Sequence, residues 1–142
     1  MKFVTRYSFG KDSVLGLYRM MQAGHEPVAL LTTVNATQNR SWVHGIPPDM
    51  MQAVAESLGL PLILCECGPD TYGVDMERGL VRAKALGAEA CAFGDIDIEG
   101  HAEYDRARCE ATGLACTLPL WQGGRETLLE ECLIAGFKPL VK

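Results

Sequence analysis

Long hydrophobic runs are missing from this chain of 142 residues. Its apolar stretches, such as residues 28–31 and 60–65, are far shorter than the roughly 20 residues that a membrane-spanning helix requires. The first six residues turn polar too early for a signal peptide. Internal repeats and low-complexity linkers are also absent. We therefore expect one globular domain over residues 1–142, in the cytoplasm and with no membrane partner.

Metal-binding cysteine motifs are missing as well. The six cysteines form no C-x-x-C motif, and no pair of histidines has zinc-ligand spacing. Most of the cysteines lie in apolar segments, so we expect buried thiols. Cys65 and Cys67 are two residues apart, which would point both side chains to one face of a strand. A redox or sulfur-carrying role for this pair is the alternative.

The chain has no excess of positive charge, since its formal net charge is −5. This charge argues against an extended nucleic-acid surface, although it is compatible with a local basic pocket. The sequence also has no G-x-S-x-G motif and no cysteine beside a histidine, so nothing indicates a covalent nucleophile. Catalysis by positioning and electrostatics is compatible with that absence.

The chain does contain a regular alternation of apolar segments and amphipathic helices. A glycine follows each predicted helix and permits the left-handed residue that ends it. The apolar runs are continuous, as in parallel strands that are covered on both faces. We therefore predict an α/β fold, a doubly wound open parallel sheet with helices on both faces. The predicted helices span about 12–23, 48–58, 74–86, 102–112 and 124–135, and the strands about 3–8, 27–34, 61–67, 90–93, 114–118 and 137–141.

The segment YSFGKDS joins the first predicted strand to the first predicted helix. In an open parallel sheet, ligands bind at the carboxyl ends of strands, where backbone N–H groups and a helix N-terminus form an anion site. Gly10 permits close approach of the backbone, and Lys11 adds a positive charge. Ser8 and Ser13 supply hydroxyl groups. Asp12 would repel phosphate unless it binds magnesium or fixes the loop; the alternative is a helix start capped by Asp12 or Ser13.

This segment resembles the S-G-G-x-D-S signature of the PP-loop ATP pyrophosphatases, which cleave ATP between its α and β phosphates. The departure is Phe9, which stands where the signature has its first glycine. Phe9 would strain or block the loop if that position needs a positive φ angle or close phosphate contact. The resemblance implies that ATP contacts Ser8, Gly10, Lys11, Asp12, Ser13 and Gly94.

Further segments resemble the diphthine–ammonia ligase family in their order and spacing. They include S-W-V-H-G at 41–45, F-G-D-I at 93–96, R-x-R-x-E at 106–110 and P-L-W at 119–121. Together they cover nearly the whole chain. Members of that family continue into a region with a G-E-x-G-E-F-x-T motif, which this sequence does not contain. We therefore expect that the family's C-terminal region is missing.

The resemblance implies a Rossmann-like sheet with strand order 3-2-1-4-5. The first and fourth strands are then neighbours, which would place Gly94 and Asp95 beside the phosphate loop. Gly94 would let ATP lie against the backbone. Asp95 would hold magnesium or orient a nucleophile. The expected catalytic residues are Lys11, Asp12 and Asp95, with Mg2+ at Asp12 and Asp95.

Four other residues are candidates for substrate contacts: His44, Glu99, Arg106 and Arg108. The acidic loop around Asp97 and Glu99 would cover the site. Its alternative is a solvated loop whose acids favour a helix N-terminus. Arg106 and Arg108 point to different faces of a helix. Surface roles are the alternatives for both arginines and for His44.

The resemblance implies ATP-dependent activation of a carboxylate. The carboxylate attacks the α-phosphorus and pyrophosphate leaves, and ammonia or an amine then displaces AMP to form an amide. Donors in the loop would stabilise the charge that develops on pyrophosphate. The expected cofactors and partners are ATP, Mg2+, ammonia and a carboxylate acceptor. In the resembling family this acceptor is diphthine on elongation factor 2.

Two other functions stay open. A PP-loop enzyme that modifies transfer RNA would be expected to carry paired catalytic cysteines or an RNA-binding extension, and neither is visible. An ATP-binding regulatory module without turnover is compatible with Phe9. A homodimer through apolar surface at the last predicted strand, 137–141, is a further expectation.

Overall fold

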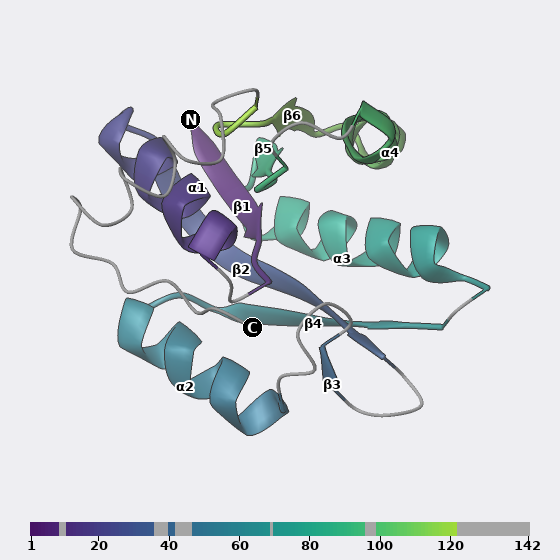
Figure 1. Ribbon diagram of the computed structural model, residues 1–142, viewed down its shortest axis with the longest axis horizontal. Coiled ribbons are helices and arrows are strands. Elements are labelled where there is room, and N and C mark those ends of the chain that lie inside the picture. Colours follow the sequence, from purple (N-terminus) through teal and green to yellow (C-terminus); the bar gives the residue numbers. More distant parts are fainter. Residues whose placement is uncertain (9–10, 36–39, 42–46, 69, 96–98, 122–142) are drawn as a thin grey trace.

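The computed structural model has a central sheet with helices on both sides (Figure 1). It describes residues 1–8, 11–35, 40–41, 47–68, 70–95 and 99–121, and at positions 11, 40 and 41 it describes the backbone alone. The predicted helix 124–135 and strand 137–141 lie outside the described residues. The expected homodimer contact lies there too.

Five strands of the described sheet run parallel. β1 (Lys2–Arg6) is central and pairs with β2 (Glu26–Asn35) and β5 (Ala90–Ala92). β4 (Leu62–Cys67) extends the sheet beyond β2, and β6 (Ala115–Thr117) extends it beyond β5. Counted along the chain, these parallel strands lie in the order 3-2-1-4-5. The predicted fold class and strand order are therefore confirmed.

One strand was not predicted. β3 (Arg40–Ser41) has two residues and pairs antiparallel with Val34 and Asn35 at the end of β2. The pairing of β2 with β1 ends at Leu31, so β3 uses the part of β2 that lies beyond it. A pair this short has no hydrophobic period of its own, and the sequence therefore gives no signal for it.

Two helices cover each face of the sheet (Figure 1). On one face lie α1 (Lys11–Gln22) and α2 (Pro48–Leu58), and on the other lie α3 (Tyr72–Ala85) and α4 (Glu99–Thr112). The predicted bounds differ from these by three residues at most, and the largest difference is the earlier start of α4. None of the described helices combines the length and the apolarity that a membrane crossing requires.

The end of α2 shows why these bounds could be predicted. Pro48 starts the helix, and Gly59 follows its last residue with a left-handed φ of 69°. The Gly59 N–H donates to the carbonyl oxygens of Ala55 and Glu56. Side chains with a Cβ adopt this backbone conformation rarely, so the glycine fixes the helix end.

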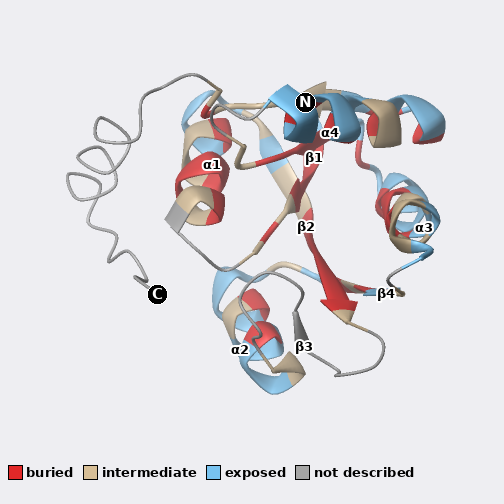
Figure 2. Ribbon diagram, turned by 45° about the vertical axis from the view of Figure 1, so that its right-hand side comes forward, coloured by how far each residue is buried: buried red, intermediate tan, exposed pale blue. Residues whose placement is uncertain are grey.

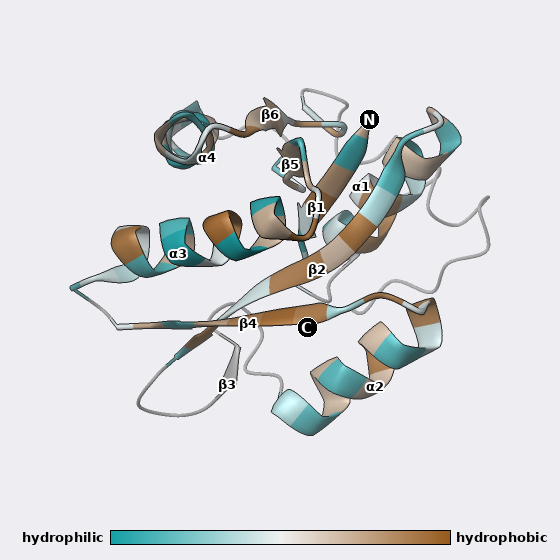
Figure 3. Ribbon diagram, turned by 180° about the vertical axis from the view of Figure 1, so that it is seen from behind, coloured by the Kyte–Doolittle hydropathy of each residue, from teal (hydrophilic) through white to brown (hydrophobic). Residues whose placement is uncertain are grey.

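Two hydrophobic clusters, one on each face of the sheet, hold the layers together. Phe3, Leu30 and Met51 belong to the cluster under α1 and α2, and Leu31 and Leu80 belong to the cluster under α3 and α4. Leu30 and Leu31 are neighbours in β2 and face opposite sides, as strand geometry requires. Figure 2 shows buried residues along β1 and β2, and Figure 3 shows hydrophobic residues along the same strands. Burial on both faces explains the continuous apolar runs.

Candidate nucleotide-binding site

A cavity of about 490 Å³ opens at the carboxyl ends of β1 and β5. The strand order reverses beside β1, and open parallel sheets bind ligands at such a point. The described residues that line the cavity come from β1, α1, α3, α4 and the segments that directly follow β1 and β5. They are Arg6, Ser8, Asp12, Ser13, Tyr72, Met76, Phe93, Gly94, Asp95, His101, Tyr104 and Asp105.

Serine hydroxyls tie the start of α1 to the end of β1. The Ser8 N–H donates to Ser13 Oγ at 2.8 Å, and the two Oγ atoms are also 2.8 Å apart. Ser13 is buried and Ser8 is half-buried, so these hydrogen bonds are partly shielded from solvent. Phe9, Gly10 and the side chain of Lys11 lie outside the described residues. The effect of Phe9 on the loop therefore stays a prediction.

Gly94 lies against the first turn of α1. A Cβ at this position would come within 3.2 Å of the Asp12 carbonyl carbon and 3.4 Å of the Ser13 nitrogen. These distances are shorter than side chains normally allow, so only glycine lets the end of β5 approach α1 this closely. The structure thus brings Gly94 beside the phosphate loop, where the strand order predicted it.

Asp95 and Asp105 form a carboxyl pair at the cavity. Asp105 comes from α4, is 8% exposed, and its Oδ2 has no hydrogen-bond partner among the described residues. Burial, and then the hydrogen bond and negative charge of Asp95, raise the pKa of Asp105 to about 9. His101 Nδ1 is 3.6 Å from Asp95 Oδ1. Asp105 therefore keeps its proton at neutral pH.

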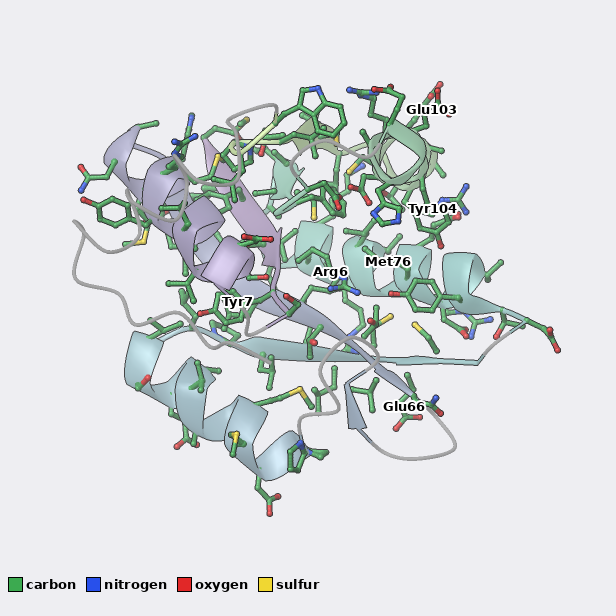
Figure 4. All side chains as sticks on the ribbon, in the orientation of Figure 1. Arg6, Tyr7, Glu66, Met76, Glu103 and Tyr104 are labelled. Atoms are coloured by element: carbon green, nitrogen blue, oxygen red, sulfur yellow. The ribbon has the colours of Figure 1, made fainter. Side chains whose placement is uncertain are left out.

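Arg6 brings a permanent positive charge to the cavity. Its side chain points toward Met76 of α3, whereas the neighbouring Tyr7 points away from α3 (Figure 4). Nη2 of Arg6 donates to Thr33 Oγ1 and to the Tyr72 hydroxyl, each at 2.9 Å. The Tyr72 hydroxyl in turn donates to Thr33 Oγ1 at 2.9 Å. These hydroxyl groups hold the guanidinium group at the α3 side of the cavity.

Within the described structure, Arg108 does not line the cavity but contacts Tyr104, which does. Its Nη1 donates to Glu77 Oε2 at 2.6 Å, and its guanidinium carbon lies 4.9 Å from the centre of the Tyr104 ring. The Tyr104 ring is also 6.4 Å from the Tyr72 ring, so these side chains connect α4 to α3. Figure 4 shows Tyr104 between the two helices. Arg108 thus positions Tyr104 through a cation–π contact.

The predicted site residues fall into three groups. Ser8, Asp12, Ser13, Gly94 and Asp95 come together at the cavity. Glu99, Arg106 and Arg108 are not among the described residues that line it, and Arg106 Nη1 pairs with Glu99 Oε1 at 3.2 Å on the surface. The third group lies outside the described residues and consists of Gly10, the side chain of Lys11, His44 and Asp97.

Sequence reasoning missed the α3 and α4 side of the cavity. A signal was present on α4, because His101, Tyr104 and Asp105 follow the i, i+3, i+4 spacing of one helix face. Arg6 and Tyr72 gave no comparable signal, since their contact joins residues 66 positions apart in the chain.

The five described cysteines are thiols rather than disulfides, and four of them are buried, as expected. Cys65 and Cys67 point to one face of β4, as predicted. Cys67 Sγ donates to Cys65 Sγ at 3.8 Å, and Cys65 Sγ donates to the Asp75 carbonyl oxygen at 2.7 Å. The bond from Cys67 lowers the pKa of Cys65, and the same bond and burial raise the pKa of Cys67. A redox or sulfur-carrying role stays a prediction.

Comparison with known proteins identifies a family for most of the chain. Residues 1–116 match the family model of the diphthamide synthase N-terminal domain. No curated protein matches the chain. A crystal structure from Methanocaldococcus jannaschii, described as a predicted subunit of tRNA methyltransferase, has a TM-score of 0.60 and 17% identity, covering 94% of this chain and 76% of that chain. At this identity the likeness shows the Rossmann-like α/β fold.

Proposed function

Because this chain belongs to the diphthamide synthase N-terminal domain family, within the PP-loop superfamily, we propose that it is an AMP-forming ligase. It would adenylylate a substrate carboxylate with ATP and then form an amide with ammonia. The observation that carries this proposal is the cavity at β1 and β5, where the ends of the phosphate loop, Gly94 and Asp95 lie together. The acceptor would be a carboxylate of the diphthine type.

The N-terminus of α1 would bind the pyrophosphate part of ATP. Backbone N–H groups at a helix N-terminus carry partial positive charge and bind anions. Lys11, the first residue of α1, would add a full charge there. When the substrate carboxylate attacks the α-phosphorus, the bond to the β-phosphate oxygen breaks and pyrophosphate leaves with its electrons. Donors already in place stabilise that developing charge.

Magnesium would enter with the nucleotide. Among the described residues, no three histidine, cysteine or acidic side chains group closely enough to hold a metal ion. Mg2+ that binds nucleotides needs only one or two carboxylates, because phosphates and water supply the other ligands. Asp12 lines the cavity next to the phosphate loop. Asp95 lines the same cavity and lies 3.6 Å from His101 Nδ1, so Asp12 and Asp95 are the two carboxylates that would hold magnesium.

The second step would form the amide. The nitrogen of ammonia attacks the carbonyl carbon of the acyl-adenylate, AMP leaves with the electrons of the broken C–O bond, and the nitrogen loses a proton. Asp95 faces the cavity and would orient the ammonia. Such positioning lowers the barrier without a covalent enzyme intermediate.

Product analysis tests this proposal directly. The protein is incubated with magnesium ATP, ammonium and a panel of carboxylates, and the nucleotide products are identified. We expect AMP and pyrophosphate, and their formation should be abolished in Lys11→Ala and Asp12→Ala. Asp49→Ala is the matched control for Asp12, because Asp49 also lies in the first turn of a helix but is exposed on α2.

Other outcomes separate the alternatives. ADP as the product would refute the pyrophosphatase mechanism, and full activity of both loop variants would refute the loop assignment. Binding of ATP without turnover in the presence of every acceptor would favour a regulatory module.

Modification of transfer RNA is the second candidate function. The structural neighbour from M. jannaschii is described as a predicted tRNA methyltransferase subunit. The net charge of −5 argues against an extended RNA surface. Adding transfer RNA to the same assay distinguishes the two functions, since AMP formation that depends on transfer RNA and not on a carboxylate would favour the second.

A further inference from the structure

Arg6 lines the cavity at the side of α3. It ends β1 and faces α3, while α1 and its N-terminus lie on the opposite face of the sheet. Tyr72, Met76 and Tyr104 line the cavity on the same side as Arg6. Aromatic and apolar side chains therefore form part of the wall near the guanidinium group, which suits the body of an organic molecule better than a triphosphate.

The guanidinium group of Arg6 is anchored by neutral partners. Nη2 donates to the hydroxyl groups of Thr33 and Tyr72, and Thr33 is only 1% exposed. Within the described part of the chain, Arg6 forms no ion pair with a carboxylate. A half-buried guanidinium group without an anion is costly, and its rigid fork matches a carboxylate with two parallel hydrogen bonds.

The charges of the cavity support an anion at this position. Arg6 is the one described lining residue with a permanent positive charge. Asp105 lines the same cavity, but among the described residues it forms no ion pair with Arg6. Burial and Asp95 raise the pKa of Asp105, which favours its neutral form. The positive charge at the α3 side is therefore left for a ligand.

We propose that Arg6, oriented by Thr33 and Tyr72, forms an oxyanion subsite at the α3 side of the cavity and binds the carboxylate of the acceptor. This proposal rests on the proposed function, because a carboxylate acceptor is its premise. The subsite places the carboxylate at the end of β1, in the same cavity as Ser8. Arg6 thus acts as a binding and positioning residue for the group that is adenylylated.

Nuclear magnetic resonance tests the subsite without requiring turnover. The probe is sodium propionate, added at constant ionic strength to the ¹⁵N-labelled protein saturated with magnesium α,β-methylene-ATP, which cannot be cleaved at the α–β position. The Nε–H signal of Arg6 is assigned by its absence in Arg6→Lys. We expect this signal to shift and saturate with propionate, while the signal of Arg78, an exposed arginine paired with Asp75, stays in place.

Variants distinguish binding from structural support. Arg6→Gln should weaken propionate binding by about tenfold or more, as expected when a charge-assisted hydrogen bond is lost, and should change affinity for the nucleotide analogue by less than about twofold. Tyr72→Phe keeps the charge but removes one anchor and should weaken propionate binding by roughly threefold. Arg78→Gln is the matched control and should change neither affinity.

Three results would overturn the subsite. An Arg6 signal that propionate does not move excludes carboxylate binding there. A variant Arg6→Gln that loses the nucleotide analogue but keeps propionate shows that Arg6 binds a nucleotide phosphate instead. Equal loss of both ligands together with a lower melting temperature shows a structural role. If no AMP is formed but propionate binds as expected, the proposed function fails and the subsite stands.

Discussion

Asp105 is a carboxyl group whose protonation should depend on folding. In the unfolded chain its pKa is the ordinary 3.8, and in the folded protein burial and Asp95 raise it to about 9. Among the described residues, the ionisable groups around it are Asp95, His101, Arg6 and the thiols of Cys109 and Cys116. The folded state therefore binds one more proton than the unfolded state between these two pKa values.

This difference predicts that stability falls as pH rises. Protons bound only in the folded state stabilise it most at low pH, so the free energy of unfolding should fall by on the order of 1 kcal/mol per pH unit between about pH 5 and 8. Asp105→Asn keeps the shape but cannot ionise, and it should remove most of this slope. Denaturant unfolding of both proteins across that pH range gives the measurement.

Asp75→Asn serves as the control for the pH experiment. Hydrogen bonds from the Thr71 hydroxyl and the Gly68 N–H lower the pKa of Asp75, so this carboxylate is ionised in both states above pH 5. Its replacement should leave the slope unchanged. An Asp105→Asn protein whose stability still falls with pH as steeply as the wild type would show that other groups cause the dependence.

The part of the site that is formed by residues close together in the chain could be predicted from the sequence. The hydroxyl groups of Ser8 and Ser13, and the turn at Gly94 and Asp95, each follow a strand within a short motif. The raised pKa of Asp105 could not be predicted, because it depends on burial and on Asp95, which lies 10 residues earlier in the chain. From the sequence alone, a carboxyl group on a helix is expected to be solvated, because its neighbours in the fold are not known.

Among the elements, α3 packs especially closely on the sheet. A Cβ at Gly79, in the middle of this helix, would come within 3.0 Å of Leu31 Cδ1 and 3.1 Å of Cys65 Sγ. Gly79 is buried, and the atoms it meets belong to buried side chains of β2 and β4. The glycine therefore sets the distance between α3 and the sheet.

Two glycine-to-alanine changes should have opposite effects. Alanine favours a helix over glycine by about 1 kcal/mol, but overpacking a core costs roughly 1–3 kcal/mol, so Gly79→Ala should lose about 1 kcal/mol of stability. At Gly100, in the first turn of α4, a Cβ meets no atom of the described residues within 4 Å. Gly100→Ala should therefore gain about 0.5 kcal/mol. Thermal unfolding measures both changes.

A stabilised Gly79→Ala protein would show that Leu31 and Cys65 move aside at little cost. Gly100 lies in the first turn of α4, where the gain in helix propensity is smaller than in the interior of α3. The difference between the two changes is therefore a lower limit for the packing cost of α3 on β2 and β4.

The positions of helices and strands could be predicted from the sequence where the hydrophobic periodicity agreed with the proline and glycine residues that end an element. The bounds of α2, residues 48–58, were predicted without error because proline and glycine mark its ends. The start of α4 was predicted at residue 102 and lies at Glu99, since the acidic turn before it continues the helix without an apolar residue to signal it. β3 was missed because two residues carry no period.

At the scale of the whole molecule, the cavity connects elements from both faces of the sheet. Its wall combines the end of β1 and the start of α1 with the turn after β5 and the inner sides of α3 and α4. A ligand that contacts these elements binds only the folded chain. Its binding should therefore stabilise the protein as a unit.

Nucleotide binding should raise the melting temperature, and a side chain at position 94 should reduce this increase. Magnesium α,β-methylene-ATP at about 100 times its dissociation constant adds about 2.7 kcal/mol of stability, which corresponds to roughly 5–10 °C for a domain of this size.

In Gly94→Ala, the new Cβ would lie 3.2 Å from the Asp12 carbonyl carbon and displace the first turn of α1. We expect about tenfold weaker binding, which removes about 1.4 kcal/mol of the gain at the same ligand concentration. Gly100→Ala, whose Cβ meets no neighbour in the part of the chain that the structure describes, should keep the full gain. An equal gain in Gly94→Ala would show that α1 and β5 do not bind the nucleotide together.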